Sequence, residues 1–242
     1  MSARAPFART AMVMAAGLGK RMRPLTITTP KPLVRVGGKP LIDHVMTHLA
    51  EAGMQRVIVN VHYLADALEA HLKARDYPFE VMISDERELL LETGGGLVKA
   101  LPMIQEDPFF CLNSDNVWLE SARSCFDELR AAWDDSRMDA LLLLVPHSRA
   151  ANYQGVGDFH LDQMGRIIRR RSGRVAPYIY TGIQLLSRRL LAGAPEGAFS
   201  TNILWNRAIA EDRLYGIAHL GQWFDVGTPG AIEPTAEALL NA

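Results

Sequence analysis

The sequence predicts an α/β protein with a mixed, mainly parallel sheet flanked by helices. Three features of the 242 residues predict this class: short continuous apolar runs, segments of helical apolar spacing between them, and a hydrophobic content of 48% that can fill a sizeable core. Strands that alternate with helices pair in parallel through right-handed crossovers. We therefore expect a single domain over residues 1–242, in which an antiparallel excursion follows the parallel half.

The first half of the chain supplies the parallel part of the sheet. Each expected strand is a continuous apolar run, which is typical of strands buried on both faces. Each expected helix carries apolar residues three and four positions apart. In order, we expect a strand at 11–15, a helix at 40–52 ended by Gly53, a strand at 57–61, a helix at about 64–72, a strand at 79–83, a helix from about 97, and a strand at 109–112.

The second half changes character at Asn152, after which apolar and polar residues alternate between turns. This alternation predicts short antiparallel strands that form a lid-like lobe beside the parallel core. In order, we expect a helix at 121–132, a strand at 140–145, hairpin strands from 152 onward, a helix from about 202 to 209, and a last helix after 229.

Composition and charge exclude several classes of partner. The net charge of −1 and the pI near 6.7 give no basic footprint, so we expect no nucleic-acid partner. No run of about 18 apolar residues and no signal-peptide pattern occurs, which predicts a cytoplasmic protein without a membrane partner. Cys111 and Cys125 lack a metal-type spacing and are expected to be reduced core thiols.

The first expected strand opens into a glycine loop made of Ala16, Gly17, Leu18 and Gly19. Glycine lets backbone N–H groups turn toward a ligand, so this loop can form a nest for phosphate oxygens. The cations that follow are Lys20, Arg21, Arg23 and Lys31. A Walker A loop is excluded because neither Ser nor Thr follows Lys20, and a dinucleotide fingerprint is excluded because Met22 replaces its third glycine. A surface loop with solvated cations is the alternative.

Two further stretches point to a ligand site. Asp115 follows the strand at 109–112, and ligands of open parallel sheets bind where strands end, so it is a candidate Mg²⁺ ligand that needs a second carboxylate. Gly94, Gly95 and Gly96 stand before a helical segment, where bare backbone allows a flat ring to approach. The alternatives are a helix-capping aspartate and a flexible glycine hinge.

The pattern GxGxRxxPLTxxxPKPLxxxxGKP at residues 17–40 resembles the signature of nucleotidyltransferases that activate sugar 1-phosphates. LETGGG at 91–96 and WFDVGTP at 223–229 add to the resemblance, which extends from Met12 to about Leu239. It implies a Rossmann-like, GT-A-like fold with a small antiparallel sugar-binding lobe. The nucleotide-binding part would span about 10–120 and the sugar-binding part about 140–230.

The resemblance also implies roles for individual residues. Mg²⁺ would be held by Asp115 and Asp225, with Arg21 at the departing β- and γ-phosphates and Lys31 at the α-phosphate. An aspartate that only caps the last helix is the alternative for Asp225. The implied nucleotide-binding residues are Ala16, Gly17, Leu18, Gly19, Lys20, Arg21, Lys31, Glu86, Gly94 and Gly95, and the implied sugar-binding residues are Asn113, Asn152, Asp158, Thr181 and Gly182.

The basic run Arg169–Arg171, with Arg174, has two interpretations. It approaches a sugar phosphate or a muramyl carboxylate, or it is a solvated strand edge. The sequence leaves this choice open.

The pattern is most similar to short family members without a C-terminal β-helix domain. They imply transfer of a nucleotidyl group from UTP to N-acetylmuramate 1-phosphate in peptidoglycan recycling, with pyrophosphate as the second product. GTP with mannose or heptose 1-phosphate, or another nucleotide and sugar, is the nearer alternative. A non-catalytic nucleotide-binding regulator is the farther alternative, although such a protein has no evident need for Lys31, Arg21 and both aspartates together.

Overall fold

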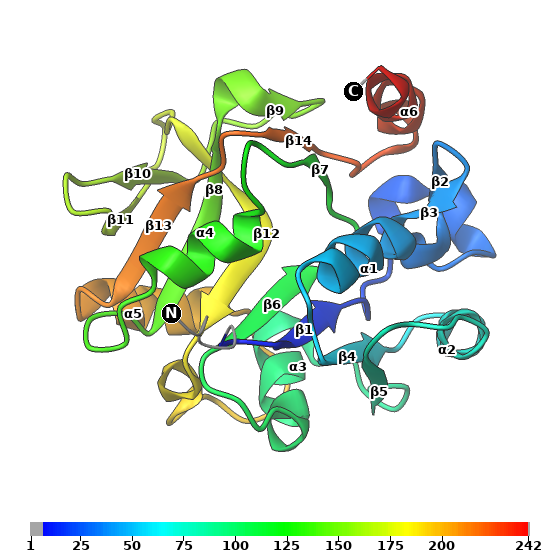
Figure 1. Cartoon of the computed structure of the whole chain (residues 1–242), viewed down its shortest axis with the longest axis horizontal. Helices are drawn as coiled ribbons and strands as arrows, with labels where there is room; N and C mark the ends of the chain where they lie inside the picture. The colour runs from blue at the N-terminus through cyan, green and yellow to red at the C-terminus, as the bar shows by residue number, and fades with distance from the viewer. Residues whose placement is uncertain (1–6, 242) are drawn as a thin grey trace, which may run out of the picture.

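The fold is built on one nine-stranded sheet with a parallel centre (Figure 1). The computed structural model describes residues 7–241. Along the sheet, the strands are β11 (Ile167–Arg169), β10 (Phe159–Leu161), β12 (Tyr178–Leu186), β6 (Phe109–Asn113), β1 (Thr10–Met14), β4 (Arg56–Val61) and β5 (Glu80–Asp85), and β8 (Ala140–Pro146) pairs with both β12 and β13 (Leu214–Ala218).

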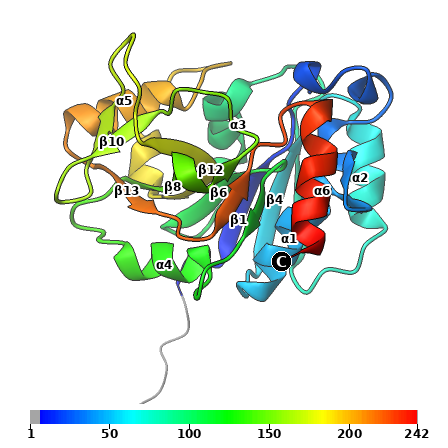
Figure 2. The ribbon, with the colours of Figure 1, turned by 90° about the horizontal axis from the view of Figure 1, so that it is seen from above.

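Helices cover both faces of this sheet (Figure 2). Helices α1 (Leu41–Glu51), α2 (Ala65–Lys73) and α4 (Cys125–Ala132) pack on one face, and α3 (Glu92–Ala100) and α5 (Asn202–Ala210) pack on the other. Successive side chains of a strand point to opposite faces, so Met12 joins the core under α3 while Val13 joins the core under α1. This double burial explains why the central strands read as unbroken apolar runs.

The sheet changes direction between β6 and β12. Strand β1 pairs in parallel with β4 and β6, whereas β12 pairs antiparallel with β6 and β8. The hairpin β10–β11 attaches to β12 and therefore continues the main sheet instead of forming a separate lobe. The antiparallel part predicted from the sequence is present, but it is one edge of the same sheet.

A small sheet returns the end of the chain to the middle of the molecule. Strand β14 (Gln222–Phe224) lies between β7 (Val117–Leu119) and β9 (Ala150–Ala151), and Phe224 is opposite Val117. Helix α6 (Ile232–Leu240) follows and packs near the ribbon of β2 (Arg35–Val36) and β3 (Lys39–Pro40) (Figure 1). Residues far apart in sequence thus meet beside the ends of β1 and β6.

Two expected helix boundaries are wrong. Helix α3 begins at Glu92, so Gly94–Gly96 lie inside the helix and not before it. All three glycines are buried, and close packing with neighbouring backbone and side chains favours residues without a Cβ there. Helix α4 begins at Cys125 and not at 121, because the Ser124 hydroxyl caps it by accepting a hydrogen bond from the N–H of Phe126 at 3.3 Å.

Candidate active site

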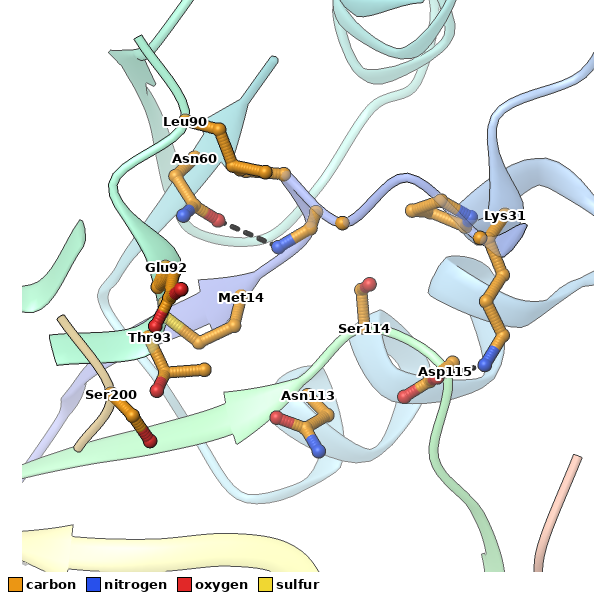
Figure 3. Close-up of a pocket in the computed structure, with 15 residues that line it drawn as sticks. Met14, Lys31, Asn60, Leu90, Glu92, Thr93, Asn113, Ser114, Asp115 and Ser200 are labelled. Carbon is orange, nitrogen blue, oxygen red and sulfur yellow. Dashed lines mark hydrogen bonds and ion pairs between the residues drawn. The ribbon is translucent and has the colours of Figure 1, made fainter. Parts of the chain in front are cut away.

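A cavity of about 420 Å³, here called the glycine-loop pocket, opens where β1 and β6 end (Figure 3). Its walls come from the loop after β1, from the turn that holds Lys31, and from the segments after β6 and before α3. The lining residues are Met14, Ala15, Ala16, Gly17, Gly19, Lys31, Pro32, Asn60, Leu90, Glu92, Thr93, Asn113, Ser114, Asp115 and Ser200. The position at the carboxyl ends of parallel strands is the usual place for a ligand in such a sheet.

The glycine loop is shaped by one of its two glycines. Gly19 has a φ of +59°, and a Cβ there would lie 3.0 Å from side-chain atoms of both Lys31 and Thr26. The Thr26 hydroxyl and the N–H of Met22 both donate to the Gly19 carbonyl, at 2.8 and 2.9 Å. Gly17 has open space around it. Within residues 7–241, the N–H groups of residues 16–19 donate no hydrogen bond, which leaves them for a ligand.

Lys31 and Asp115 meet at the wall of this pocket. Their side chains form an ion pair and are 13% and 29% exposed (Figure 3). Asp115 owes its place to strand β6, which ends two residues earlier, and Lys31 to a 3-10 helix over Lys31–Leu33 that follows Pro30. A cation and a carboxylate are therefore held together beside the free amides of the loop.

Asp225 and Arg21 lie next to this pair. Strand β14 delivers Asp225, because Phe224 is paired with Val117 just beyond Asp115. A Cβ on Gly227 would lie 2.7 Å from Arg21 Nη1 and 2.9 Å from Asp225 Oδ1, so the bare backbone there makes room for both side chains. Burial raises the pKa of Asp225; the charges of Arg21 and Lys31 oppose this rise, and the charge of Asp115 adds to it.

Three loop residues of the predicted nucleotide set do not line the glycine-loop pocket. Leu18 is half-buried and Lys20 is exposed. Arg21 is exposed and lies beside Asp225.

The predicted base-reading residues have internal partners. The N–H groups of Gly94 and Gly95 donate to the carbonyl of Phe199 at 2.8 and 3.2 Å, so they are not free to read a nucleobase. The Glu86 side chain is fully buried and does not line the pocket. The structure therefore does not place these residues as direct base contacts. The segment before α5 packs against α3, and its Phe199 carbonyl accepts the glycine N–H groups.

Asn60 is a lining residue that the sequence analysis missed. Its Oδ1 accepts the N–H of Ala15 at 2.6 Å (Figure 3). Its Nδ2 donates to Glu86 Oε1 at 2.8 Å. Glu86 thus orients Asn60, and Asn60 fixes the start of the glycine loop. A buried polar residue at the end of the strand run VIVNV is the one signal for it in the sequence.

A second cavity of about 420 Å³, here called the arginine pocket, adjoins the first and shares Met14, Thr93, Asn113 and Ser200 with it. It also contains Asp158 from the predicted sugar set and Arg169 and Arg170 from the basic run. The remaining lining residues are Cys111, Phe159, Tyr180, Gln184, Thr201, Asn202 and Trp205. Two pockets that share a wall can hold the two ends of one ligand or two ligands that react.

The predicted sugar residues divide between these pockets and the core. Gly182 has a φ of +87° at an irregularity of β12, and a Cβ there would lie 2.6 Å from Asn113 Nδ2, so it lets Asn113 reach both pockets. Thr181 is buried, and its hydroxyl donates to the carbonyl of Leu143 at 2.8 Å. Asn152 donates to Thr235 Oγ1 on α6 at 2.9 Å and lines neither pocket. The side chains of Thr181 and Asn152 therefore have structural partners.

Comparison with known proteins gives both a family and relatives. A family model described as nucleotidyl transferase matches residues 10–171. The chain is 43% identical to N-acetylmuramate alpha-1-phosphate uridylyltransferase of Caulobacter vibrioides, over 96% of this chain and 97% of that protein. It is 32% identical to the protein of the same description from Neisseria meningitidis, over 96% and 98% of the two chains.

More distant similarities are consistent with this grouping. The mannose-1-phosphate guanylyltransferase catalytic subunit beta of Danio rerio is 28% identical over 90% of this chain and 61% of that protein. The solved structure of the inositol-1-phosphate CTP transferase from T. maritima superposes with a TM-score of 0.77 at 18% identity, and covers 97% of this chain and 95% of that one. At such low identity, this last similarity speaks for the fold.

Proposed function

This chain belongs to the nucleotidyl transferase family, and we propose that it transfers the uridylyl group of UTP to N-acetylmuramate 1-phosphate. The products are UDP-N-acetylmuramate and pyrophosphate, and the reaction serves the recycling of peptidoglycan. The observation that carries the proposal is the 43% identity to the Caulobacter uridylyltransferase along nearly the full length of both proteins. The glycine-loop pocket supports it with a cavity of about 420 Å³ at the ends of β1 and β6, lined by the glycine loop and Lys31.

Charge neutralisation and positioning carry the chemistry. A sugar-phosphate oxygen attacks the α-phosphorus of the nucleotide while pyrophosphate leaves in line, so the new P–O bond forms as the old one breaks. The attacking phosphate monoester is already anionic near neutral pH and needs no strong base. Lys31, held at the pocket wall, neutralises charge around the α-phosphorus, and Arg21 stabilises the departing β- and γ-phosphates.

Asp115 and Asp225 suit a divalent cation. The pairing of Phe224 with Val117 carries Asp225 to the segment that follows Asp115, and a divalent cation bound there would neutralise both carboxylates. Among residues 7–241, no group of three or more His, Cys, Asp or Glu gathers as a metal centre, and Mg²⁺ is often held by two carboxylates together with substrate phosphates and water. When bound, Mg²⁺ would supply Lewis-acid stabilisation of the phosphate oxygens.

We place this reaction in the cytoplasm, where UTP and sugar phosphates are available. The buried free thiols of Cys111 and Cys125 suit a reducing compartment. Separately, no helix within residues 7–241 has the length and apolarity needed to cross a bilayer.

Pyrophosphate release tests the proposal. We would measure it with Mg²⁺ across UTP, GTP, CTP, ATP and dTTP, each paired with N-acetylmuramate, N-acetylglucosamine, glucose or mannose 1-phosphate. Release restricted to UTP with N-acetylmuramate 1-phosphate is the expected result. Preference for GTP with mannose 1-phosphate would favour the activity that the Danio rerio relative is named for. Nucleotide binding without release in any pair would contradict catalysis.

A further inference from the structure

The arginine pocket holds two guanidinium groups without a carboxylate partner. In the part of the chain that the structure describes, neither Arg169 nor Arg170 lies within 4.0 Å of a carboxylate oxygen, whereas Arg56, Arg75 and Arg87 elsewhere on the surface all form ion pairs. A half-buried guanidinium that only neutral groups contact keeps its charge available for an incoming anion.

Neutral oxygens hold Arg169 in place. Its Nε donates to Asn206 Oδ1 at 2.5 Å and its Nη2 donates to Asn202 Oδ1 at 2.8 Å, both from helix α5. The guanidinium carbon lies 5.5 Å from the centroid of the Phe159 ring. Within residues 7–241, Nη1 donates no hydrogen bond. Two of the three guanidinium nitrogens of Arg169 are therefore held by protein acceptors, and Nη1 is left to donate to a ligand.

Arg170 is fixed in the same way by backbone carbonyls. Its Nε donates to the carbonyl of Gly157 at 3.0 Å, and its Nη1 donates to the carbonyl of Arg174 at 3.0 Å. Its Nη2 has no hydrogen-bond acceptor in the described part of the chain. The acid Asp158, which lines the same pocket, accepts a hydrogen bond from the N–H of Tyr180 at 2.9 Å, and within residues 7–241 it forms no ion pair with either arginine.

The arginines and the glycine loop face different pockets. Lys31 and Asp115 line the glycine-loop pocket alone, and Arg169 and Arg170 line the arginine pocket alone. Asn113 lies in the wall that both share. A substrate that reaches into both pockets should thus carry a second anionic group away from its reacting phosphate.

On the basis of the proposed function, we propose that Arg169 and Arg170 bind the carboxylate of the lactyl ether on N-acetylmuramate 1-phosphate and thereby select this sugar. N-acetylglucosamine 1-phosphate has the same ring and phosphate but lacks the lactyl group. Both arginines are thus specificity-determining residues, and they explain why a basic run occurs in a chain whose net charge is −1. The aromatic rings of Phe159, Tyr180 and Trp205 complete an amphipathic wall for the sugar.

The test combines changes in the protein with changes in the substrate. We would measure kcat/KM of the full chain and of Arg169→Gln and Arg170→Gln with three sugars: N-acetylmuramate 1-phosphate, its uncharged lactamide and N-acetylglucosamine 1-phosphate. Each variant should lose about 10- to 100-fold with the carboxylate substrate, the range for one charge-assisted hydrogen bond, and less than about threefold with the two sugars that lack the carboxylate. The unsubstituted chain should lose a similar factor when the lactamide replaces the carboxylate.

Arg171→Gln is the matched control, because Arg171 belongs to the same run but is exposed and lines neither pocket. It should behave like the unsubstituted chain with all three sugars. Equal losses with the sugar that has the carboxylate and the two that lack it would show that the arginines only support the fold and would overturn the carboxylate site alone. Unchanged kcat/KM in both variants would overturn it as well. Lack of turnover of N-acetylmuramate 1-phosphate by the unsubstituted chain would instead overturn the proposed substrate, and the site with it.

Discussion

The glycine-loop pocket and the arginine pocket have similar volumes and a shared wall, yet the chain builds them differently. The glycine-loop pocket takes about half of its lining from one contiguous stretch, residues 14–32, and the rest from β4, the start of α3, the end of β6 and Ser200. The arginine pocket takes its lining in short contributions from β1, α3, β6, β10, β11, β12 and α5. A site that takes half of its lining from one local segment leaves a readable signature in the sequence, whereas a site made of short contributions from many elements leaves scattered single residues.

The pockets also differ in how their charges are balanced. In the first, Lys31 and Asp115 neutralise each other, and Arg21 stands beside Asp225. In the second, the acceptors of both cations within the described residues are neutral. This contrast fits the proposed roles, in which the first pocket binds a metal ion and a triphosphate and the second binds a single anionic group.

The largest expected effect is on turnover, from a substitution in the glycine-loop pocket. Lys31→Met should lower kcat by about 100-fold or more, because a preorganised charge at the reacting phosphate is lost. Asp115 is 29% exposed, so water can solvate it after the change, and the free energy of unfolding should move little. Steady-state pyrophosphate release and urea unfolding measure the two quantities.

Lys73→Met on α2 is the control for this change, because its side chain is exposed and its ammonium forms a surface ion pair with Glu69. It should retain full turnover. Normal turnover by Lys31→Met together with reduced stability would mean that Lys31 has a structural role and that the two pockets do not differ in function.

A smaller effect is expected on stability, and it should differ between a glycine of the loop and a glycine of α3. A Cβ at Gly95 would lie 2.2 Å from the carbonyl oxygen of Gly197, so Gly95→Ala should reduce the free energy of unfolding by about 1–2 kcal/mol even after the gain in helix propensity. Gly17→Ala meets no atom within 4 Å and should leave stability unchanged. Urea unfolding of the two variants tests this. Equal stability of both would show that the segment around Gly197 yields easily to the new methyl group.

The smallest effect concerns the apolar floor of the arginine pocket. Burial raises the pKa of the Cys111 thiol to about 12, so at pH 8 the thiol stays protonated and unreactive. Iodoacetamide at pH 8 should therefore leave the native protein unmodified, whereas the unfolded chain should gain two adducts by intact-mass measurement, one at Cys111 and one at Cys125. Rapid labelling of Cys111 in the native protein would mean that solvent reaches this floor readily.

The sequence anticipated the central fold well. The strands at β1, β4, β5, β6 and β8 and the helices α1 and α2 were predicted to within two residues of their observed ends, because fully buried strands and amphipathic helices carry strong periodic signals. It failed at α3, where helix propensity argued against three consecutive glycines. Packing against the segment around Phe199 overrides that propensity, and no local pattern announces a contact with a segment about 100 residues away.

The sequence by itself determined the central strands, the glycine loop and the family, since each of these depends on residues that are neighbours in the chain. The tertiary structure alone decided that Glu86 accepts a hydrogen bond from Asn60 instead of facing a ligand. It also decided that the N–H groups of Gly94 and Gly95 donate to the carbonyl of Phe199. It also decided that Arg169 and Arg170 line a cavity and not a solvated edge. The physical reason is the same in each case: a side chain or an amide is available to a ligand only if no distant part of the chain satisfies it first.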